Sequence, residues 1–238
     1  MTGPQTLTRP LAARVASLPA PVERSDNPPV APAVIEAAVA ALEAGKTHYT
    51  DRPGILPLRE QAVNWLGQHY GLELSPDAVT ITIGATEARY VAVKQLAAPG
   101  TSIAAVEARP GIAGAAALIG VPLVTDINKL DTVSVVYLTP DDPAAARDAL
   151  LAQAAAHGWW VIWDTSIGEA GAFHPAQAAD LAPQVVTLGS LSHDLPGWRM
   201  GWMAGSKAAN KLRAYKQSMT ICSPSISQWA ALGLEDGR

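Results

Sequence analysis

The hydrophobic and polar positions of the 238-residue chain follow two rhythms in turn. Residues 32–44 and 58–70 repeat their apolar positions at helical spacing, which predicts two helices joined by a loop at 48–57. From residue 77 onward, short apolar or β-branched runs alternate with helical patterns. The runs predict strands over 79–83, 102–106, 121–125, 133–138, 159–163, 185–188 and 200–204. The intervening patterns predict helices over 87–96, up to about 119, 143–157 and 207–219.

Several predicted strands are apolar on both faces, and the run WWVIW at 159–163 is apolar at every position. Such strands are typical of a sheet that helices cover from both sides. The sequence therefore predicts an α/β fold with three layers, α/β/α, around a mostly parallel sheet of about seven strands. Residues 1–30 are rich in proline and polar residues and are expected to form an N-terminal arm, followed by one large domain over 31–238.

Composition narrows the classes of protein to which the chain could belong. Hydrophobic residues make up 49% and charged residues 16%, which is the opposite of a disordered chain. A net charge of −4, with 17 basic residues spread thinly, argues against a nucleic-acid partner. The single cysteine excludes an internal disulfide and a zinc site built from cysteines, which fits a cytoplasmic protein. No apolar run is long enough to span a membrane, so no membrane partner is expected.

The first candidate for chemistry is the stretch Gly84, Ala85 and Thr86, which follows a predicted strand and opens a helix. Small residues let an anion approach the backbone, and a helix N-terminus offers N–H groups and the positive end of the helix dipole. The alternative is an ordinary helix start, in which Thr86 caps the helix and Glu87 favours its first turn.

A second candidate is Asp164, at the end of the apolar strand predicted over 159–163. Burying a carboxylate beside such a strand is unfavourable unless a cationic group pairs with it, and a protonated heterocyclic nitrogen would serve. The alternative is an aspartate that caps the next helix.

The segment from Gly189 to Gly201 holds a third group of candidates. Ser190, Ser192 and Arg199 could hold a phosphate, because arginine presents a planar fork of donors. His193 is the only group in this segment that titrates near neutral pH. The alternative is a loop of glycine and proline that carries a surface arginine.

Two weaker signals complete the inventory. The stretch Thr139-Pro140-Asp141-Asp142-Pro143 is by itself a turn that starts a helix. Three further histidines, His48, His69 and His157, have no partner at metal-binding spacing, and the sequence contains no motif for a metal or nucleotide loop. No metal site is therefore predicted.

Taken in order, these segments resemble the class I and II aminotransferases, which are fold-type-I pyridoxal-phosphate enzymes. The segment at 49–59 (YTDRPGILPLR) is similar to the family's tyrosine, glycine and leucine–arginine signature. The segment at 84–88 (GATEA) is similar to its phosphate turn, and Trp163-Asp164 stands where the family keeps its pyridine-binding aspartate. The segment at 190–201 (SLSHDLPGWRMG) resembles the Ser-x-Ser-Lys and Gly-x-Arg-x-Gly motifs.

The resemblance implies a role for each matching residue. Pyridoxal 5'-phosphate would be the cofactor, and Asp164 would pair with its pyridine nitrogen. The phosphate would be held by the contacts Tyr49 (from a neighbouring subunit), Gly84, Ala85, Thr86, Ser190, Ser192 and Arg199. Amino acids and keto acids would be the substrates, and the chain would form a homodimer.

The sequence also departs from the family at the residues that do the chemistry. His193 stands at the position of the family's cofactor-bound lysine, and a histidine cannot form that covalent bond. Asp142 replaces an asparagine that faces the cofactor's phenolate oxygen, and Ile167 replaces a tyrosine. Arg109 replaces the aromatic residue that stacks on the ring. The family's small C-terminal domain, with its arginine for the substrate carboxylate, has no counterpart in 31–238.

These departures predict an aminotransferase-like protein with impaired or no ordinary transamination, which binds pyridoxal phosphate weakly and without a covalent bond. Three alternatives stay open at this point. His193 could act as a general base on a cofactor–substrate adduct formed in solution. The chain could be a non-catalytic pseudoenzyme or a dimerising interaction protein. It could also be the product of a decayed or frameshifted gene.

Overall fold

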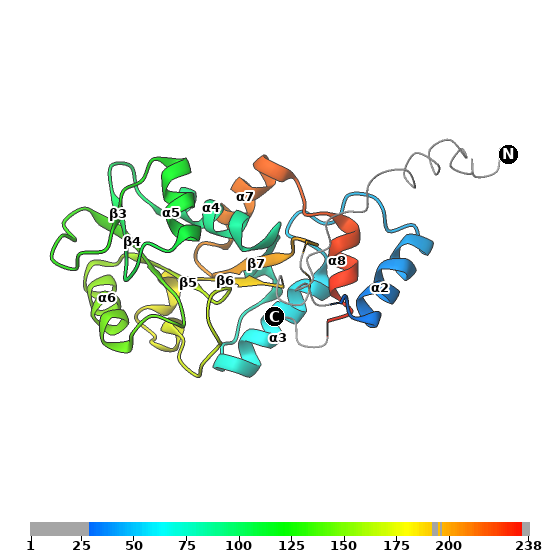
Figure 1. Ribbon diagram of the computed structural model, residues 1–238, viewed down its shortest axis with the longest axis horizontal. Coiled ribbons are helices and arrows are strands. Elements are labelled where there is room, and N and C mark those ends of the chain that lie inside the picture. Colours follow the sequence, from blue (N-terminus) through cyan, green and yellow to red (C-terminus); the bar gives the residue numbers. More distant parts are fainter. Residues whose placement is uncertain (1–28, 192–194, 196, 235–238) are drawn as a thin grey trace.

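A computed structural model describes residues 29–191, 195 and 197–234 of the chain. It shows a seven-stranded sheet between layers of helices, which confirms the predicted α/β class (Figure 1). The strands are β1 (Val79–Thr82), β2 (Ser102–Ala105), β3 (Leu123–Val124), β4 (Val133–Leu138), β5 (Trp160–Asp164), β6 (Val185–Ser190) and β7 (Gly201–Ala204). The helices are α2 (Pro32–Glu43), α3 (Leu56–Tyr70), α4 (Gly84–Leu96), α5 (Pro110–Ile119), α6 (Ala144–His157), α7 (Ala209–Thr220) and α8 (Ser225–Ala231).

The strands follow the order β1-β7-β6-β5-β4-β2-β3 across the sheet. Neighbours from β6 to β3 pair in parallel, whereas β7 is antiparallel to both β1 and β6. Consequently β1, β2, β4, β5 and β6 all end at the same edge of the sheet. In open α/β sheets this carboxyl edge is where ligands bind.

Apolar side chains fill three clusters around the sheet. One lies under α4, α5 and α7, and includes Val91, Ile112 and Leu212. A second lies between the opposite face and α6. The third joins α2, α3 and α8 to the β1 end of the sheet. Figure 1 shows the resulting layers, with α4, α5 and α7 on one side of the sheet and α3 and α6 on the other.

Most predicted elements lie within two residues of the observed ones, and α4 and α5 show what decides a boundary. We predicted a helix from residue 87, but α4 begins at Gly84, whose φ of +71° starts the helix directly after β1. α5 ends at Ile119, where Gly120 takes a left-handed C-cap conformation, as a glycine stop signal implies. The expected arm at 1–30 lies almost wholly outside the described residues. Among the described residues, no helix is long and apolar enough to cross a membrane.

Candidate functional site

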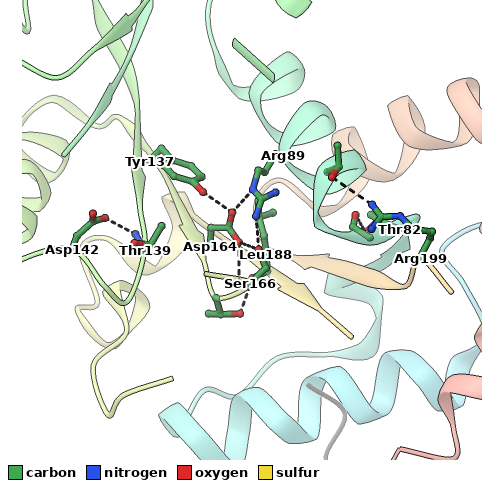
Figure 2. Close-up of polar contacts among 12 residues, drawn as sticks. Thr82, Arg89, Tyr137, Thr139, Asp142, Asp164, Ser166, Leu188 and Arg199 are labelled. Carbon is green, nitrogen blue, oxygen red and sulfur yellow. Dashed lines mark hydrogen bonds and ion pairs between the residues drawn. The ribbon is translucent and has the colours of Figure 1, made fainter. Parts of the chain in front are cut away.

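The carboxyl edge of the sheet collects most of the predicted site residues. Asp164 is the last residue of β5, and Ser190 is the last residue of β6. Asp142 lies in the turn after β4, and Gly84 opens α4 after β1. Figure 2 shows the polar contacts at this edge, with Asp164 between the Asp142 turn and Arg199. Parallel strands therefore bring together residues that lie far apart in the sequence.

Asp164 is fully buried, with 0% of its surface exposed, and both carboxylate oxygens accept hydrogen bonds. Its Oδ2 accepts from Arg89 Nε at 2.5 Å and from the Tyr137 hydroxyl at 2.6 Å. Its Oδ1 accepts from the Ser166 backbone N–H at 3.0 Å and from the Ser166 hydroxyl at 2.6 Å. The cationic partner that the sequence led us to expect is thus present, and it belongs to the chain itself (Figure 2).

The protonation states of this cluster follow from its burial and charge. Burial lowers the pKa of the Arg89 guanidinium, but the charge of Asp164 together with the interactions with Asp164 and Tyr137 outweighs that effect, so the pKa of Arg89 is raised. Burial, reinforced by the nearby Asp164 carboxylate, raises the pKa of the Tyr137 phenol. Arg89 therefore stays charged, and Tyr137 stays a hydrogen-bond donor, across the physiological range.

Asp142 also has a partner within the chain. Its Oδ2 accepts from the backbone N–H of Thr139 at 2.7 Å, which closes the turn that the sequence predicted. Its Oδ1 lies 3.3 Å from Arg109 Nη2, and the Asp142 side chain is only 3% exposed. Arg109 comes from the residue before α5 and also lies 3.6 Å from the carboxylate of Glu107. The arginine that stands at the ring-stacking position is therefore an ion-pair partner of Asp142.

The other end of the site is formed by the first turn of α4 and Arg199. Arg199 Nη2 donates to the hydroxyl of Thr86 at 3.4 Å, and the Arg199 side chain is exposed. A Cβ atom on Gly84 would lie 2.8 Å from the same Nη2, so the guanidinium rests directly against the helix start. Helix N–H groups, a hydroxyl and a guanidinium are thereby gathered in one place. These donor types together are suited to a phosphate.

The close contact between β7 and the first turn of α4 requires a glycine at position 201, the first residue of β7. A Cβ atom there would lie 2.8 Å from the backbone carbon of Gly84 and 3.0 Å from the nitrogen of Ala85. β7 can therefore approach the first turn of α4 closely only without a side chain at this position. Gly201 also pairs with Ser190 across β6 and β7, which places Ser190 beside the same turn.

Glu87 plays the role that the alternative interpretation of this segment proposed. Its Oε2 accepts from the backbone N–H of Ile83 at 2.6 Å, and its Oε1 accepts from the Thr220 hydroxyl at 3.0 Å. The carboxylate thus satisfies a backbone donor at the helix start and ties α4 to α7. The predicted Thr86 cap is wrong, because Ile83 is the N-cap and its side chain makes no capping hydrogen bond. The Thr86 hydroxyl instead accepts from Arg199.

The remaining predicted residues lie elsewhere. Tyr49 lies in the loop between α2 and α3, and 83% of its surface is exposed. Ser192 and His193 lie outside the described residues. Lys216 on α7 was not among the predicted site residues; it is fully buried, and its Nζ donates to the Ser223 hydroxyl at 3.1 Å. Burial lowers the pKa of Lys216.

Sequence reasoning missed Arg89, Tyr137 and Ser166. Arg89 lies among buried alanine and valine residues of α4, and it is itself only 9% exposed. An arginine on the apolar face of a helix is the signal that could have identified it, because such a charge requires a buried partner. Tyr137 gave no such signal within its apolar strand.

No cluster of three metal-ligating side chains occurs among the described residues. The fold itself is shared with solved aminotransferase structures. Residues 22–108 match the family described as aminotransferase class I and II. The chain is 28% identical, over 232 residues, to the arginine–pyruvate transaminase of Pseudomonas aeruginosa, and 26% identical, over 230 residues, to the aspartate aminotransferase of Thermotoga maritima. The chain is thus similar to class I and II aminotransferases over most of its length.

The matches cover 83% and 84% of this chain but only 58% and 61% of those two relatives. The chain therefore spans about three fifths of the length of the curated relatives it matches. Among solved structures, the N-succinyldiaminopimelate aminotransferase of Mycobacterium tuberculosis superimposes with a TM-score of 0.78 at 24% identity. That comparison covers 88% of this chain and 64% of the other, and it establishes the fold.

The contacts described above decide how the site would accept pyridoxal phosphate. At the phosphate end, Thr86, Arg199 and the α4 start offer suitable donors. At the ring end, the Asp164 carboxylate already accepts from Arg89, Tyr137 and Ser166. The residues therefore fit the phosphate group of this cofactor but do not fit its pyridine ring.

Proposed function

We propose that this chain is an aminotransferase-like protein that does not carry out ordinary transamination. In this proposal it holds a small phosphate-bearing molecule without a covalent bond. His193 at the lysine position supports the first part, because imidazole does not provide the primary amine that the family uses. Amino acids and keto acids, the substrates that the resemblance implies, would then not be converted by the usual route.

The observation that carries the proposal is the guanidinium of Arg199 against the first turn of α4. Arg199 Nη2 lies 3.4 Å from the Thr86 hydroxyl and against Gly84, so a ligand oxygen would meet both side chains and the helix start. The helix dipole and the arginine both favour a negatively charged ligand at this place. We call this group of residues, Gly84, Ala85, Thr86, Ser190 and Arg199, the phosphate cradle.

Each residue of the phosphate cradle would have a simple role. Arg199 would donate two parallel hydrogen bonds to phosphate oxygens, and Thr86 and Ser190 would donate single ones. Gly84 keeps the space beside the guanidinium free of a side chain. Pyridoxal phosphate would bind through its phosphate alone, which accounts for weak and non-covalent binding.

The decisive experiment is an absorption spectrum of the purified chain with added pyridoxal phosphate, followed by borohydride reduction and intact-mass measurement. We expect reversible binding that inorganic phosphate displaces, with no covalent mass increase at a single site. An Arg199→Gln variant should lose this binding. A stoichiometric covalent adduct, or amino-group transfer between an amino acid and a keto acid, would contradict the proposal.

We further propose that two copies of the chain associate over an apolar groove beside the phosphate cradle. The groove has a volume of about 500 Å³ and is lined by Leu118 and Met219 as well as by Thr86 and Arg199. Leu118 is 79% exposed and Met219 42% exposed in the single chain. A second copy would cover this surface and bring its exposed Tyr49 towards the phosphate, as the resemblance implies.

A further inference from the structure

We propose that the Arg89 guanidinium occupies the position on Asp164 that a protonated ring nitrogen of a ligand would otherwise take. Arg89 thereby determines which ligands the site accepts. With Arg89 on Asp164, the site takes phosphate-bearing molecules and rejects those that must place a protonated heterocyclic nitrogen on this carboxylate. The inference rests on the phosphate cradle of the proposed function and adds the specificity of its neighbouring ring end.

The first argument is hydrogen-bond capacity. An ionised carboxylate offers about four acceptor positions. Asp164 uses them for Arg89 Nε, the Tyr137 hydroxyl, and the backbone N–H and hydroxyl of Ser166. A ring N–H has no acceptor position left unless one of these donors leaves. Of the three residues that donate to Asp164, only Arg89 carries a positive charge, so only its departure would also free the carboxylate charge for a ligand.

The second argument is charge. Asp164 is fully buried, and a buried carboxylate is stable only with a cationic or strongly donating partner. The Arg89 guanidinium supplies that cation at 2.5 Å. A ring cation would then face another cation over a carboxylate that is already neutralised. Capacity and charge therefore both act against the ring.

The third argument is that Arg89 is held in place and is not a mobile surface group. Arg89 Nη2 donates to the Ser166 hydroxyl at 2.5 Å, and only 9% of the residue is exposed. A Cβ atom on Gly111 would lie 2.9 Å from Arg89 Nη1, so the glycine in α5 makes room for the guanidinium. α4, α5 and the segment after β5 thus position it from three sides.

A second arginine–aspartate ion pair lies next to the end of the neighbouring strand, β4. Arg109 pairs with Asp142 after β4, as Arg89 pairs with Asp164 after β5. At two of the positions where the resemblance places a contact to the ring, an aspartate is thus neutralised by an arginine of the chain. Both aspartates at the ring end, Asp164 and Asp142, are therefore already paired with a cation when no ligand is bound.

The test compares the affinities for inorganic phosphate and pyridoxal phosphate, measured by calorimetry on the full chain. We expect the wild-type chain to bind the two with affinities within about tenfold. Arg89→Leu should tighten pyridoxal phosphate by roughly ten- to a hundredfold while inorganic phosphate is unchanged, because Asp164 regains a free acceptor. Arg147→Leu is the matched control, since Arg147 pairs with Asp148 on α6 and should alter neither affinity.

Two results would overturn the role of Arg89. The wild-type chain could prefer pyridoxal phosphate over inorganic phosphate by more than a hundredfold. Alternatively, Arg89→Leu could fold and show no gain in that preference. Failure of the wild-type chain to bind inorganic phosphate at all would instead contradict the phosphate cradle, so the two proposals fail differently.

A double-mutant cycle of thermal unfolding tests whether Arg89 and Asp164 are energetically coupled, and it needs no ligand. It compares Arg89→Leu, Asp164→Asn and the double variant. Each single change strands one buried partner and should lower the melting temperature by roughly ten degrees, whereas the double variant should recover most of that loss. Single effects that simply add would show that Arg89 and Asp164 are not coupled, and would overturn the proposal without any ligand.

Discussion

The two ends of the site treat their arginines in opposite ways. At the phosphate end, Arg199 is exposed, and its hydrogen bond goes to a neutral hydroxyl, that of Thr86. At the ring end, Arg89 is buried, and its bond goes to the carboxylate of Asp164. The same side-chain type thus leaves a positive charge for a ligand at one end and cancels a negative charge at the other.

In our proposal, this difference lets the site hold the phosphate of a ligand while it rejects the ring. A buried charge has to be paired for the chain to fold, so whichever partner is covalently part of the chain is always present. An exposed charge carries no such requirement, because water solvates it until a ligand arrives. Loss of the arginine should therefore lower ligand affinity at the phosphate end and stability at the ring end.

The largest expected effect is a loss of stability when the close approach at the phosphate end is disturbed. Gly201→Ala places a Cβ atom 2.8 Å from backbone atoms of Gly84 and Gly189, neither of which can move independently. We expect the free energy of unfolding to fall by about 2–3 kcal/mol, measured by urea denaturation.

Gly114→Ala is the control for this substitution. Gly114 lies within α5, and nothing would lie within 4 Å of its Cβ atom, so alanine should stabilise the chain by about 1 kcal/mol. A Gly201→Ala protein as stable as the wild type would show that β7 and α4 are not in close contact.

A pH titration tests His174, a buried group outside the site. Burial lowers the pKa of His174 to about 3, so its ring is neutral in the folded chain while the unfolded chain takes up a proton near its ordinary value. Stability from this residue is full above pH 6.5 and is lost as the pH falls towards 3. We expect the free energy of unfolding to drop by about 2 kcal/mol between pH 7 and pH 5.

A His174→Gln variant should remove this dependence. Its unfolding free energy should change less steeply below pH 6.5, by up to about 1.4 kcal/mol per pH unit. An unchanged slope would assign the acid sensitivity to another part of the chain.

Loss of the exposed arginine should affect binding and leave stability nearly unchanged. Arg199→Gln removes a charged donor from the phosphate cradle, so the affinity for inorganic phosphate should fall about ten- to a hundredfold by calorimetry. The melting temperature should shift by no more than a degree or two, because the side chain is exposed. Arg147→Gln should leave the affinity unchanged. Equal affinities for the two variants would remove Arg199 from the phosphate cradle.

The smallest effect on the fold is expected at the apolar groove. Leu118→Glu places a charge on a side chain that is 79% exposed, so the single chain should stay folded while association of two copies is lost. Light scattering should report the mass of two chains for the wild type and of one chain for the variant. Ile127→Glu, at an exposed position outside the groove lining, should leave the mass unchanged. A wild-type chain with the mass of one copy would contradict the proposed dimer.

Much of the fold could be predicted because its signals are local. β4 occupies 133–138 as predicted, since a run of apolar residues between turn signals marks a buried strand. The start of α4 was placed three residues too late, because a glycine with positive φ reads as a turn until β1 and β7 hold it in place. The antiparallel placement of β7 between β1 and β6 also had no signal in the sequence, since pairing direction depends on the path of the chain between strands.

The site was predictable in part for the same reason. Asp164 was identified because it is an acid at the end of an apolar strand, and Gly84 because it is a glycine between a strand and a helix. Arg89 was missed because its meaning depends on Asp164, which lies 75 residues further along the chain. Arg109 and Asp142, 33 residues apart, were each identified, but their pairing with one another was not.

The sequence by itself determined the order of helices and strands, the anion-favouring start of α4, the buried acid at the end of β5 and the histidine at position 193. These features are local, because backbone periodicity, glycine conformation and residue type are set within a few positions. Tertiary structure alone decided that Arg89 neutralises Asp164, that Arg109 neutralises Asp142 and that Arg199, among the described residues, contacts a hydroxyl and no carboxylate. The physical reason is that Coulomb attraction and hydrogen bonding act through space over a few ångströms, and only the folded sheet brings these side chains within that distance.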